Sequence, residues 1–343
     1  MVEAPVTGPS SVTARTSDDT SELDTDLLIV GAGPAGLFGA YYAGFRGMSV
    51  ILVDSLPELG GQVSALYPEK AILDVAGFVN VKGRELVEQL VEQAASAKPK
   101  YLLGRTASSL VCDDESVTMT LDDGTVIRAK VVIVTAGIGK FTPRVLPAGD
   151  GWEDRGLVFF VPSFAEYAGR DVVIVGGGDS AFDWAHHLEP IASSITLVHR
   201  RDQFRAHQAT VDAVLAGSTE VITKAQVTAL NGEHHVESVD ITTADGEVLV
   251  RPAQSVVAAL GFIADLSAMK EWGVEFDKRH IKVDTAMRTN LPRVFAAGDI
   301  TEYDGKVRLI AVGFGEVATA VNNAAVLVDP EAHAFPGHSS EGS

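Results

Sequence analysis

Two glycine-rich loops have the residue types and the spacing that bind the phosphates of a dinucleotide. Their residues are Gly31, Gly33, Pro34, Ala35 and Gly36 in the first loop, and Gly176, Gly178, Asp179, Ser180 and Ala181 in the second. Glycines in this order allow a sharp turn, a close approach of the backbone to a pyrophosphate and close packing of the next helix, whose N-terminus attracts anions. The pair of loops predicts two nucleotide sites, and the alternative is one functional loop with one decayed duplicate.

The two loops are followed by different side chains at the place where a ribose would bind. After the first loop, the next strand ends on Asp54, whose carboxylate can accept hydrogen bonds from ribose hydroxyls. The corresponding residues after the second loop are His199, Arg200, Arg201 and Arg205. Arginines there can hold a 2′-phosphate through charge-assisted, bidentate hydrogen bonds. The second site is therefore predicted to bind NADPH, and the alternative is a solvated basic loop.

The segments around each loop are those of a βαβ unit. Residues 27–30 and 49–53 are apolar runs that predict buried parallel strands on either side of the first loop and its helix. Residues 171–175 and 194–198 repeat this order around the second loop. Because strand, loop, helix and second strand all follow in order, nucleotide binding is favoured over an ordinary glycine-rich turn.

Small residues follow other predicted core strands. Residues 131–134 end in Thr135-Ala136-Gly137, residues 256–260 end in Gly261, and residues 294–297 end in Gly298-Asp299. Small residues at such places let the backbone approach a ligand closely. Asp299 could bind the polyol or phosphate groups of a dinucleotide, and it could also cap the following segment.

The other segments predict a mixture of helices, hairpins and one long loop. Residues 55–78 contain breakers such as Pro57 and Gly60 and are predicted to be irregular, and loops of this length are usually functional. Residues 82–97 predict an amphipathic helix, residues 107–134 predict alternating strands in hairpins, and residues 221–250 predict further strands and hairpins. A final helix is expected at 313–327, with Gly313 and Gly315 at or just before its start.

The amino-acid composition limits the classes of protein to which the chain can belong. The 343 residues, 46% hydrophobic and 21% charged, suggest two or three globular domains. The net charge of −19 argues against nucleic-acid binding, and against an acidic partner unless basic residues cluster. No continuous run of about 18 apolar residues occurs, so no membrane span is expected.

The titratable residues offer no catalytic grouping of their own. The single cysteine, Cys112, excludes an intrachain disulfide and a cysteine-based metal site, and suits a reducing cytoplasm. The scattered histidines predict no metal site and no Ser–His–Asp triad, so the chemistry should reside in a cofactor. Residues 1–24 are polar and are predicted to be a disordered tail.

The motifs GAGPAG, HRRxxxR and FAAGD together resemble flavoprotein disulfide reductases with two dinucleotide sites. Residues 156–170, where thioredoxin reductases carry C-x-x-C, contain no cysteine, so a dithiol relay is absent. The chain is similar instead to the thioredoxin-reductase-like ferredoxin–NADP reductases. The matching stretches are LGGQVSALYPEKAILDVAGF (59–78), GGGDSAFDWA (176–185), HRRDQFRAH (199–207), GFGEVATAVNNA (313–324) and FPGHSS (335–340).

The resemblance implies an α/β architecture with two Rossmann-like, three-layer domains. The NADPH-binding domain, residues 147–262, would be inserted in a discontinuous FAD-binding domain of residues 25–146 and 263–343. The implied FAD contacts are Asp54, Gln62, Tyr67, Ala107, Phe141, Asp299 and Ser340, together with Gly61, Gly137, Gly298 and His338. The family leads one to expect Glu at position 54, but Asp54 is long enough to reach a ribose.

The implied function is electron transfer between NADPH and ferredoxin or flavodoxin, as in ferredoxin–NADP(+) reductase. A hydride would pass to FAD N5 and single electrons would leave, with Tyr67 and His338 stacked on opposite faces of the isoalloxazine. A frayed tail at 333–343 is the alternative for His338. The family also implies a cytoplasmic homodimer. The rival functions are an NADPH diaphorase or quinone reductase and an NADPH-sensing flavoprotein without enzymatic activity.

Overall fold

Two apolar strands, β1 (Glu22–Val30) and β8 (Val126–Val134), form the centre of the larger sheet in the computed structural model, which describes residues 22–335 and 337. They pair in parallel along their whole lengths, from Glu22 opposite Val126 to Val30 opposite Val134. The predicted tail ended at residue 24, but residues 22–24 belong to β1. The polar start of β1 is ordered because its backbone pairs with β8, and Leu23 packs against the core.

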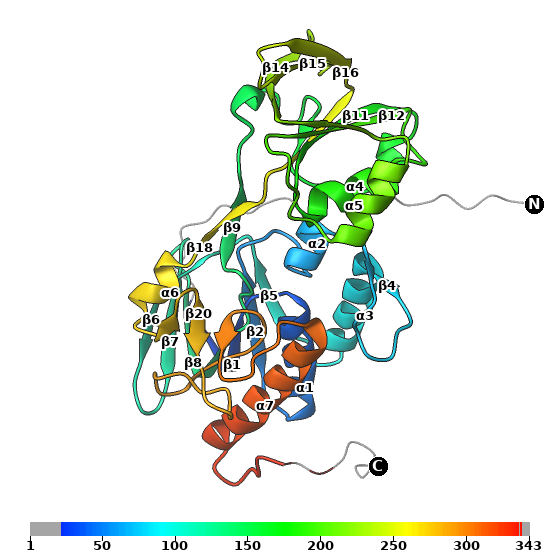
Figure 1. Cartoon of the computed structure of the whole chain (residues 1–343). Coiled ribbons are helices and arrows are strands. Elements are labelled where there is room, and N and C mark those ends of the chain that lie inside the picture. The colour runs from blue at the N-terminus through cyan, green and yellow to red at the C-terminus, as the bar shows by residue number, and fades with distance from the viewer. Residues whose placement is uncertain (1–21, 336, 338–343) are drawn as a thin grey trace, which may run out of the picture.

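The chain forms two lobes, which are visible in Figure 1. Strand β9 (Lys140–Pro143) leads into the small lobe, residues 144–261, and β18 (Phe262–Asp265) returns to the large lobe, residues 22–143 and 262–335. The two strands pair antiparallel between the lobes. The predicted domain boundaries, at 146/147 and 262/263, fall three residues after β9 and within β18, and they stay a prediction.

The large lobe contains a seven-stranded sheet in the order β5-β2-β1-β8-β7-β6, with β21 pairing with the end of β8. Its other strands are β2 (Val50–Asp54), β5 (Lys100–Leu103), β6 (Ala107–Cys112), β7 (Val117–Leu121) and β21 (Val294–Ala296). Strands β5, β2, β1, β8 and β21 are parallel, whereas β6 and β7 form the predicted antiparallel hairpin.

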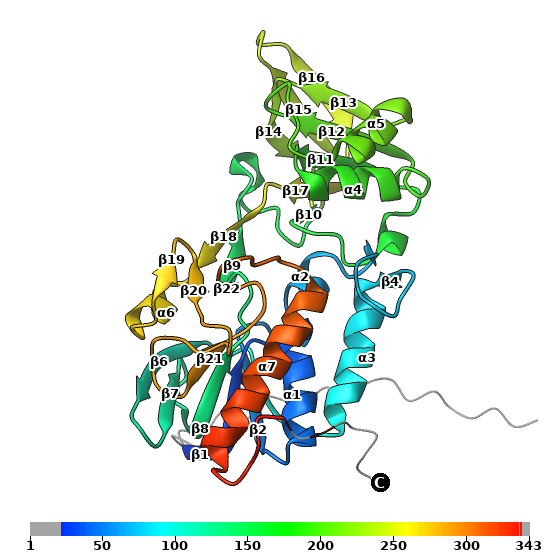
Figure 2. The same ribbon diagram turned by 60° about the horizontal axis from the view of Figure 1, so that its bottom comes forward.

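Alternating side chains of β1 face two different layers. Leu27 and Ile29 pack against the helices α1 (Pro34–Phe45), α3 (Gly83–Ala95) and α7 (Ile310–Val328), which Figure 2 shows beside one another. Leu28 and Val30 pack on the opposite face, against the β6–β7 hairpin and α6 (Ser267–Glu271). Both faces of the parallel strands are therefore covered, which explains why their sequences are apolar without alternation.

Helix α7 is the one helix among the described residues whose length and apolar composition would suffice to cross a membrane. Its buried side chains pack against α1 and β8, and they include the charged Glu316, which places α7 in the lobe's core. The helix begins at Ile310, so Gly313 and Gly315 lie within it and not at its start. The predicted helix started three residues too far along the chain, because the apolar residues Ile310 and Ala311 were assigned to the preceding loop.

The small lobe combines a five-stranded parallel sheet with a three-stranded antiparallel one. The parallel strands are β10 (Leu157–Val158), β17 (Ser255–Ala259), β11 (Asp171–Gly176), β12 (Ser194–His199) and β13 (Glu220–Thr223). Helices α4 (Asp179–Leu188) and α5 (Gln208–Ala216) pack on it, and β14 (Ala225–Asn231), β15 (Ser238–Thr243) and β16 (Val248–Pro252) form the antiparallel sheet. Residues 221–223 lie in the stretch predicted to contain strands and hairpins, and β13 is a parallel edge strand there.

Short elements complete the fold. They are α2 (Gln62–Leu66), β3 (Ala71–Ile72), β4 (Val81–Lys82), η1 (Pro147–Gly149), η2 (Phe164–Tyr167), β19 (Phe276–Asp277), β20 (His280–Lys282) and β22 (Thr301–Glu302). Residues 55–78 were predicted to be irregular throughout, yet they contain α2 and β3. One turn of helix forms there because Val63 is buried in the core.

Candidate dinucleotide sites

A pocket opens at the carboxyl ends of β1, β2 and β8, which is where parallel α/β sheets bind ligands. Most of the predicted FAD contacts line it. They are Gly31, Gly33, Pro34, Ala35, Asp54, Gly61, Gln62, Tyr67, Ala107, Gly137, Phe141, Gly298 and Asp299. Gly36 does not line the pocket because it lies inside the first turn of α1. His338 and Ser340 lie outside the described residues.

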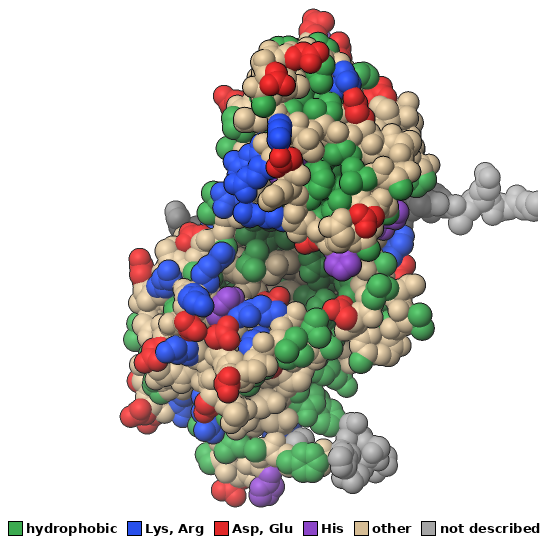
Figure 3. Space-filling view, in the orientation of Figure 1, with side chains coloured by type: hydrophobic (Ala, Val, Ile, Leu, Met, Phe, Trp, Pro, Cys, Tyr) green, Lys and Arg blue, Asp and Glu red, His purple; other side chains and the backbone are tan. Residues whose placement is uncertain are grey.

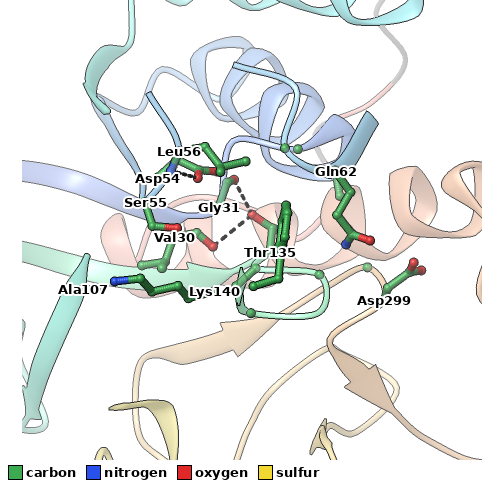
Figure 4. Close-up of a pocket in the computed structure, with 18 of the residues that line it drawn as sticks. Val30, Gly31, Asp54, Ser55, Leu56, Gln62, Ala107, Thr135, Lys140 and Asp299 are labelled. Atoms are coloured by element: carbon green, nitrogen blue, oxygen red, sulfur yellow. Dashed lines mark hydrogen bonds between the residues drawn. The ribbon is translucent and has the colours of Figure 1, made fainter. Parts of the chain in front are cut away.

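The first glycine loop is held by close contacts at Gly31 and presents open backbone at Gly33. Gly31 has φ +116°, and a Cβ there would lie 2.6 Å from the carbonyl oxygen of Thr135. The Thr135 hydroxyl donates to the carbonyl oxygen of Gly31 at 2.8 Å (Figure 4). A Cβ on Gly33 would meet no atom within 4 Å, so this residue presents bare backbone to the pocket. Helix α1 also has no side-chain cap, which leaves its N-terminal N–H groups for an anion.

Asp54 both faces the pocket and holds the loop. Its carboxylate accepts hydrogen bonds from the backbone N–H groups of Ala32, at 2.6 Å, and Leu56, at 2.8 Å. Burial raises the pKa of Asp54, and these two hydrogen bonds oppose that rise. Each carboxylate oxygen keeps a lone pair, so the side chain can also accept from a ligand hydroxyl.

Gln62 and Asp299 lie at the opposite end of the pocket from Asp54 and Lys140 (Figure 4). Gln62 begins α2, and Gly137, with φ +56°, faces it so closely that a Cβ on the glycine would lie 2.5 Å from Nε2 of Gln62. Asp299 follows β21. The pocket is therefore long enough to separate an adenosine-like end near Asp54 from a second end near Gln62.

The second glycine loop has a comparable shape in the small lobe. A Cβ on Gly178 would meet no atom within 4 Å, and α4 starts at Asp179 without a side-chain cap. The backbone N–H of Arg205 donates to the Gly177 carbonyl at 2.8 Å, and that of His207 donates to Asp179 Oδ1 at 2.8 Å. These bonds fold the arginine-containing loop back onto the glycine loop.

The charged side chains of that loop differ in their surroundings. The His199 ring lies so close to Gly177 that a Cβ on the glycine would be 2.3 Å from Cε1 of His199. Burial, with smaller contributions from Arg200 and Arg201, lowers the pKa of His199, although its hydrogen bond to Gln203 opposes this. Arg200, Arg201 and Arg205 are exposed and form no ion pair within the described part of the chain. Three guanidinium groups are thus free to bind an anion beside the second loop.

Tyr67 lies between the two sites. It lines the large pocket and also a smaller one between the lobes, which Asp179 and Ser180 line from the start of α4. The lobes are tied beside this pocket by the ion pair from Lys70 to Asp183, at 2.7 Å, and by a hydrogen bond from Arg84 to the Pro162 carbonyl, at 3.0 Å. Tyr67 therefore lies between the pocket of the first glycine loop and the first residues of α4.

We expect the Tyr67→Phe variant to keep the wild-type pH dependence of reduction by NADPH. Burial, followed by the charges of Asp299 and Asp74, raises the pKa of Tyr67 to about 12. The usual tyrosine pKa is about 10. The contribution of Tyr67 to the free energy of unfolding is therefore fully present below pH 10 and is lost as the pH rises through 12. The rate constant of flavin reduction, measured by stopped flow below pH 10, should show no pH dependence caused by Tyr67. A change of rate at alkaline pH that is lost in Tyr67→Phe would contradict this.

Several pocket residues were not predicted as ligand contacts. They are Val30, Val53, Ser55, Leu56, Val63, Arg105, Thr106, Thr135, Ala136, Gly139, Lys140, Asp265, Leu266, Ser267, Ala268, Met269, Trp272, Leu309, Ile310 and Gly313. The position of Thr135 directly after a core strand was a usable signal. The α6 residues gave none, because they reach the pocket through tertiary packing, with Trp272 Nε1 donating to the Ser108 carbonyl at 3.0 Å. Among the described residues, no group of His, Cys, Asp and Glu is arranged to hold a metal.

Comparison with known proteins defines the class of protein that this fold and these sites represent. The family described as pyridine nucleotide-disulphide oxidoreductase matches residues 25–324. The crystal structure of T. acidophilum thioredoxin reductase has a similar fold, with a TM-score of 0.72 and 28% identity over 90% of this chain and 99% of the other. The predicted fold class, with two Rossmann-like domains and one inserted in the other, is confirmed.

Relatives with higher sequence identity indicate a narrower family. A protein of a Nocardioides species named ferredoxin–NADP reductase is 69% identical over 325 residues, covering 94% of this chain and 98% of its own. A protein of Frankia alni with the same name is 62% identical, covering 92% of this chain and 98% of its own. The chain therefore belongs to the ferredoxin–NADP reductase family, within the pyridine nucleotide-disulphide oxidoreductases. The resemblance drawn from the motifs is confirmed.

Proposed function

We propose that this protein is a ferredoxin–NADP(+) reductase, an FAD-dependent enzyme that transfers electrons between NADPH and ferredoxin. Its cofactors are FAD and NADP(H). The observation that carries the proposal is that Tyr67 lines both the pocket of the first glycine loop and a smaller pocket that reaches the start of α4, in a chain whose single cysteine is Cys112. Bound FAD supplies the conversion between a two-electron donor and one-electron acceptors.

The residues of the large pocket fit FAD. The uncapped start of α1 and the bare backbone of Gly33 would hold the pyrophosphate, and Asp54 would accept from a ribose. Gln62, Tyr67 and Asp299 would contact the far end of the cofactor. In the small lobe, Arg200, Arg201 and Arg205 would hold the 2′-phosphate of NADPH. The inferred roles of His338 and Ser340 rest on the family resemblance alone.

The local charge around the hollow between the lobes supports an acidic protein partner. The net charge of the whole chain, −19, would by itself disfavour such a partner. However, Figure 3 shows Lys and Arg side chains gathered on both sides of the hollow. Lys140 and Arg105 line the large pocket itself. A small acidic electron carrier, ferredoxin or flavodoxin, would be attracted to this side, and the attraction should weaken as salt is added.

The test is the oxidation of NADPH with purified ferredoxins, flavodoxins and menadione as acceptors. The proposal expects fast, salt-sensitive reduction of at least one ferredoxin. Turnover with menadione alone would favour a diaphorase, and a flavin that NADPH does not bleach would favour a sensor. From the family resemblance we also infer a homodimer in the cytoplasm, which sedimentation and cell fractionation test.

We expect Cys112→Ser to leave NADPH-driven ferredoxin reduction unchanged, and neither form to reduce thioredoxin or small disulfides. Burial and the neighbouring Asp113 raise the pKa of the Cys112 thiol, so little thiolate exists near neutral pH. Its place at the end of β6 offers no second cysteine as a partner. A large loss of ferredoxin reduction in Cys112→Ser would reveal a thiol role.

A further inference from the structure

An ion pair is buried directly behind the pocket wall, between Lys306 and Glu316. The side chains are 1% and 4% exposed, respectively, and neither belongs to the groups that would touch a nucleotide. A buried pair is costly to desolvate and is tolerated when further hydrogen bonds satisfy both ions. The hydrogen-bond partners of the two side chains therefore indicate the role of the pair.

The partners of Glu316 lie before and after β22, between residues 298 and 306. One carboxylate oxygen accepts from the backbone N–H of Gly298 at 2.7 Å. The other accepts from the Tyr303 hydroxyl at 2.6 Å and from Lys306. Burial, and then the bond to Glu316, raises the pKa of Tyr303 to about 12, so this hydroxyl remains a donor at neutral pH.

Lys306 binds the carbonyl group of the same glycine. Its Nζ donates to the carbonyl oxygen of Gly298 at 3.1 Å, and the Thr301 hydroxyl donates to that oxygen at 2.8 Å. Both polar groups of Gly298 are thus held by buried side chains. Gly298 has φ +83°, a conformation that few other residues adopt, and it leads directly into Asp299.

We propose that Lys306 and Glu316 are positioning residues that fix the Gly298–Asp299 turn against bound FAD. Gly298 and Asp299 line the pocket, and Gly298 also lies beside Ala35 of the first glycine loop, with its added Cβ 3.4 Å from that methyl group. The pair therefore joins α7 to the turn that would contact the flavin end of the cofactor. This inference rests on the FAD part of the proposed function and is independent of the electron acceptor.

The test uses purified holoenzyme of Lys306→Met, Glu316→Gln and the double variant. Lys306→Met leaves a buried carboxylate unpaired, and removing one partner of a buried pair is strongly destabilising. We expect the FAD dissociation constant to rise by about tenfold or more in both single variants, because Glu316→Gln keeps an oxygen for Gly298 but leaves Lys306 buried without a counter-charge. Released FAD fluorescence measures affinity, and the visible flavin spectrum and midpoint potential report the displaced Asp299.

Arg251→Met is the matched control. Arg251 pairs with Glu220 in the small lobe through bonds of 2.6 and 2.7 Å, and this variant should keep wild-type FAD affinity and potential. The double variant should remain impaired, because Gly298 still lacks its Lys306 donor. Restored FAD affinity in the double variant would overturn the positioning role in favour of charge balance alone.

A purely structural pair would behave differently. It would lower the melting temperature of the variants without changing FAD affinity, flavin spectrum or potential, and that result would overturn the inference. If Lys306→Met does not fold, the nearly isosteric Glu316→Gln carries the test. All measurements omit NADPH and ferredoxin, so a wild-type protein that binds FAD but reduces no ferredoxin would refute only the proposed acceptor.

Discussion

Replacing Arg200 and Arg201 together by alanine should raise the dissociation constant for NADPH by about a hundredfold or more, while binding of NADH stays largely unchanged. Each hydrogen bond from a guanidinium to the 2′-phosphate contributes about 1.5–3 kcal/mol, and tenfold in affinity corresponds to about 1.4 kcal/mol. Neither arginine is held by an ion pair in the described part of the chain, so no internal partner competes for them.

The measurement is a titration of each variant with NADPH and NADH, followed by stopped-flow reduction of the flavin. Arg170→Ala is the control, because Arg170 precedes β11 and lies at the opposite end of that strand from the glycine loop. It should bind both nucleotides normally. Equal losses for NADPH and NADH in the double-arginine variant would show that the 2′-phosphate is not bound there.

Gly36→Ala should give a protein without FAD. A Cβ at this position would lie 1.9 Å from the carbonyl oxygen of Gly31 and 2.9 Å from the Thr135 hydroxyl. The backbone cannot yield as a flexible side chain would, so α1 must move away from the sheet and the phosphate-binding turn must change shape. Overpacking of this kind costs about 1–3 kcal/mol or more, and here it acts directly on the pocket.

Gly315→Ala is the matched glycine control for this experiment. A Cβ on Gly315 would meet no atom within 4 Å, and alanine is favoured over glycine inside a helix by about 1 kcal/mol. This variant should keep its FAD and melt slightly higher. The visible absorbance per protein measures FAD content, and a Gly36→Ala protein with a full complement of FAD would contradict the role given to that glycine.

Local sequence patterns were sufficient for the parts of the fold that depend on neighbours in the chain. The strand before Gly31, the helix after it and the repeat around Gly176 follow from short apolar periods and glycine spacing, and the structure has them. Strand β5 was missed because its four residues, KYLL, do not alternate clearly. The ordered start of β1 was missed because its pairing partner, β8, lies about a hundred residues away in the chain.

The two pockets could be predicted only in part, for the same reason. The roles of the glycines and of Asp54 could be predicted from the local motif. In contrast, α6 and Lys140 reach the large pocket through packing between distant segments. The Lys306–Glu316 pair could likewise not be predicted, because nine residues of loop and helix separate the two charges and the sequence gives no sign that they are buried. Burial, and not residue type, gives these side chains their importance.

The strand pair β9–β18 makes the small lobe a single insertion in the chain of the large one. The backbone N–H of Arg144 donates to the Gly261 carbonyl at 2.9 Å, so the two ends of the insert lie side by side. One insertion into one gene position would therefore have been enough to combine the lobes during evolution, without breaking the larger sheet. The same junction is a natural place to graft a nucleotide-binding lobe with a different coenzyme preference onto this flavin-binding scaffold.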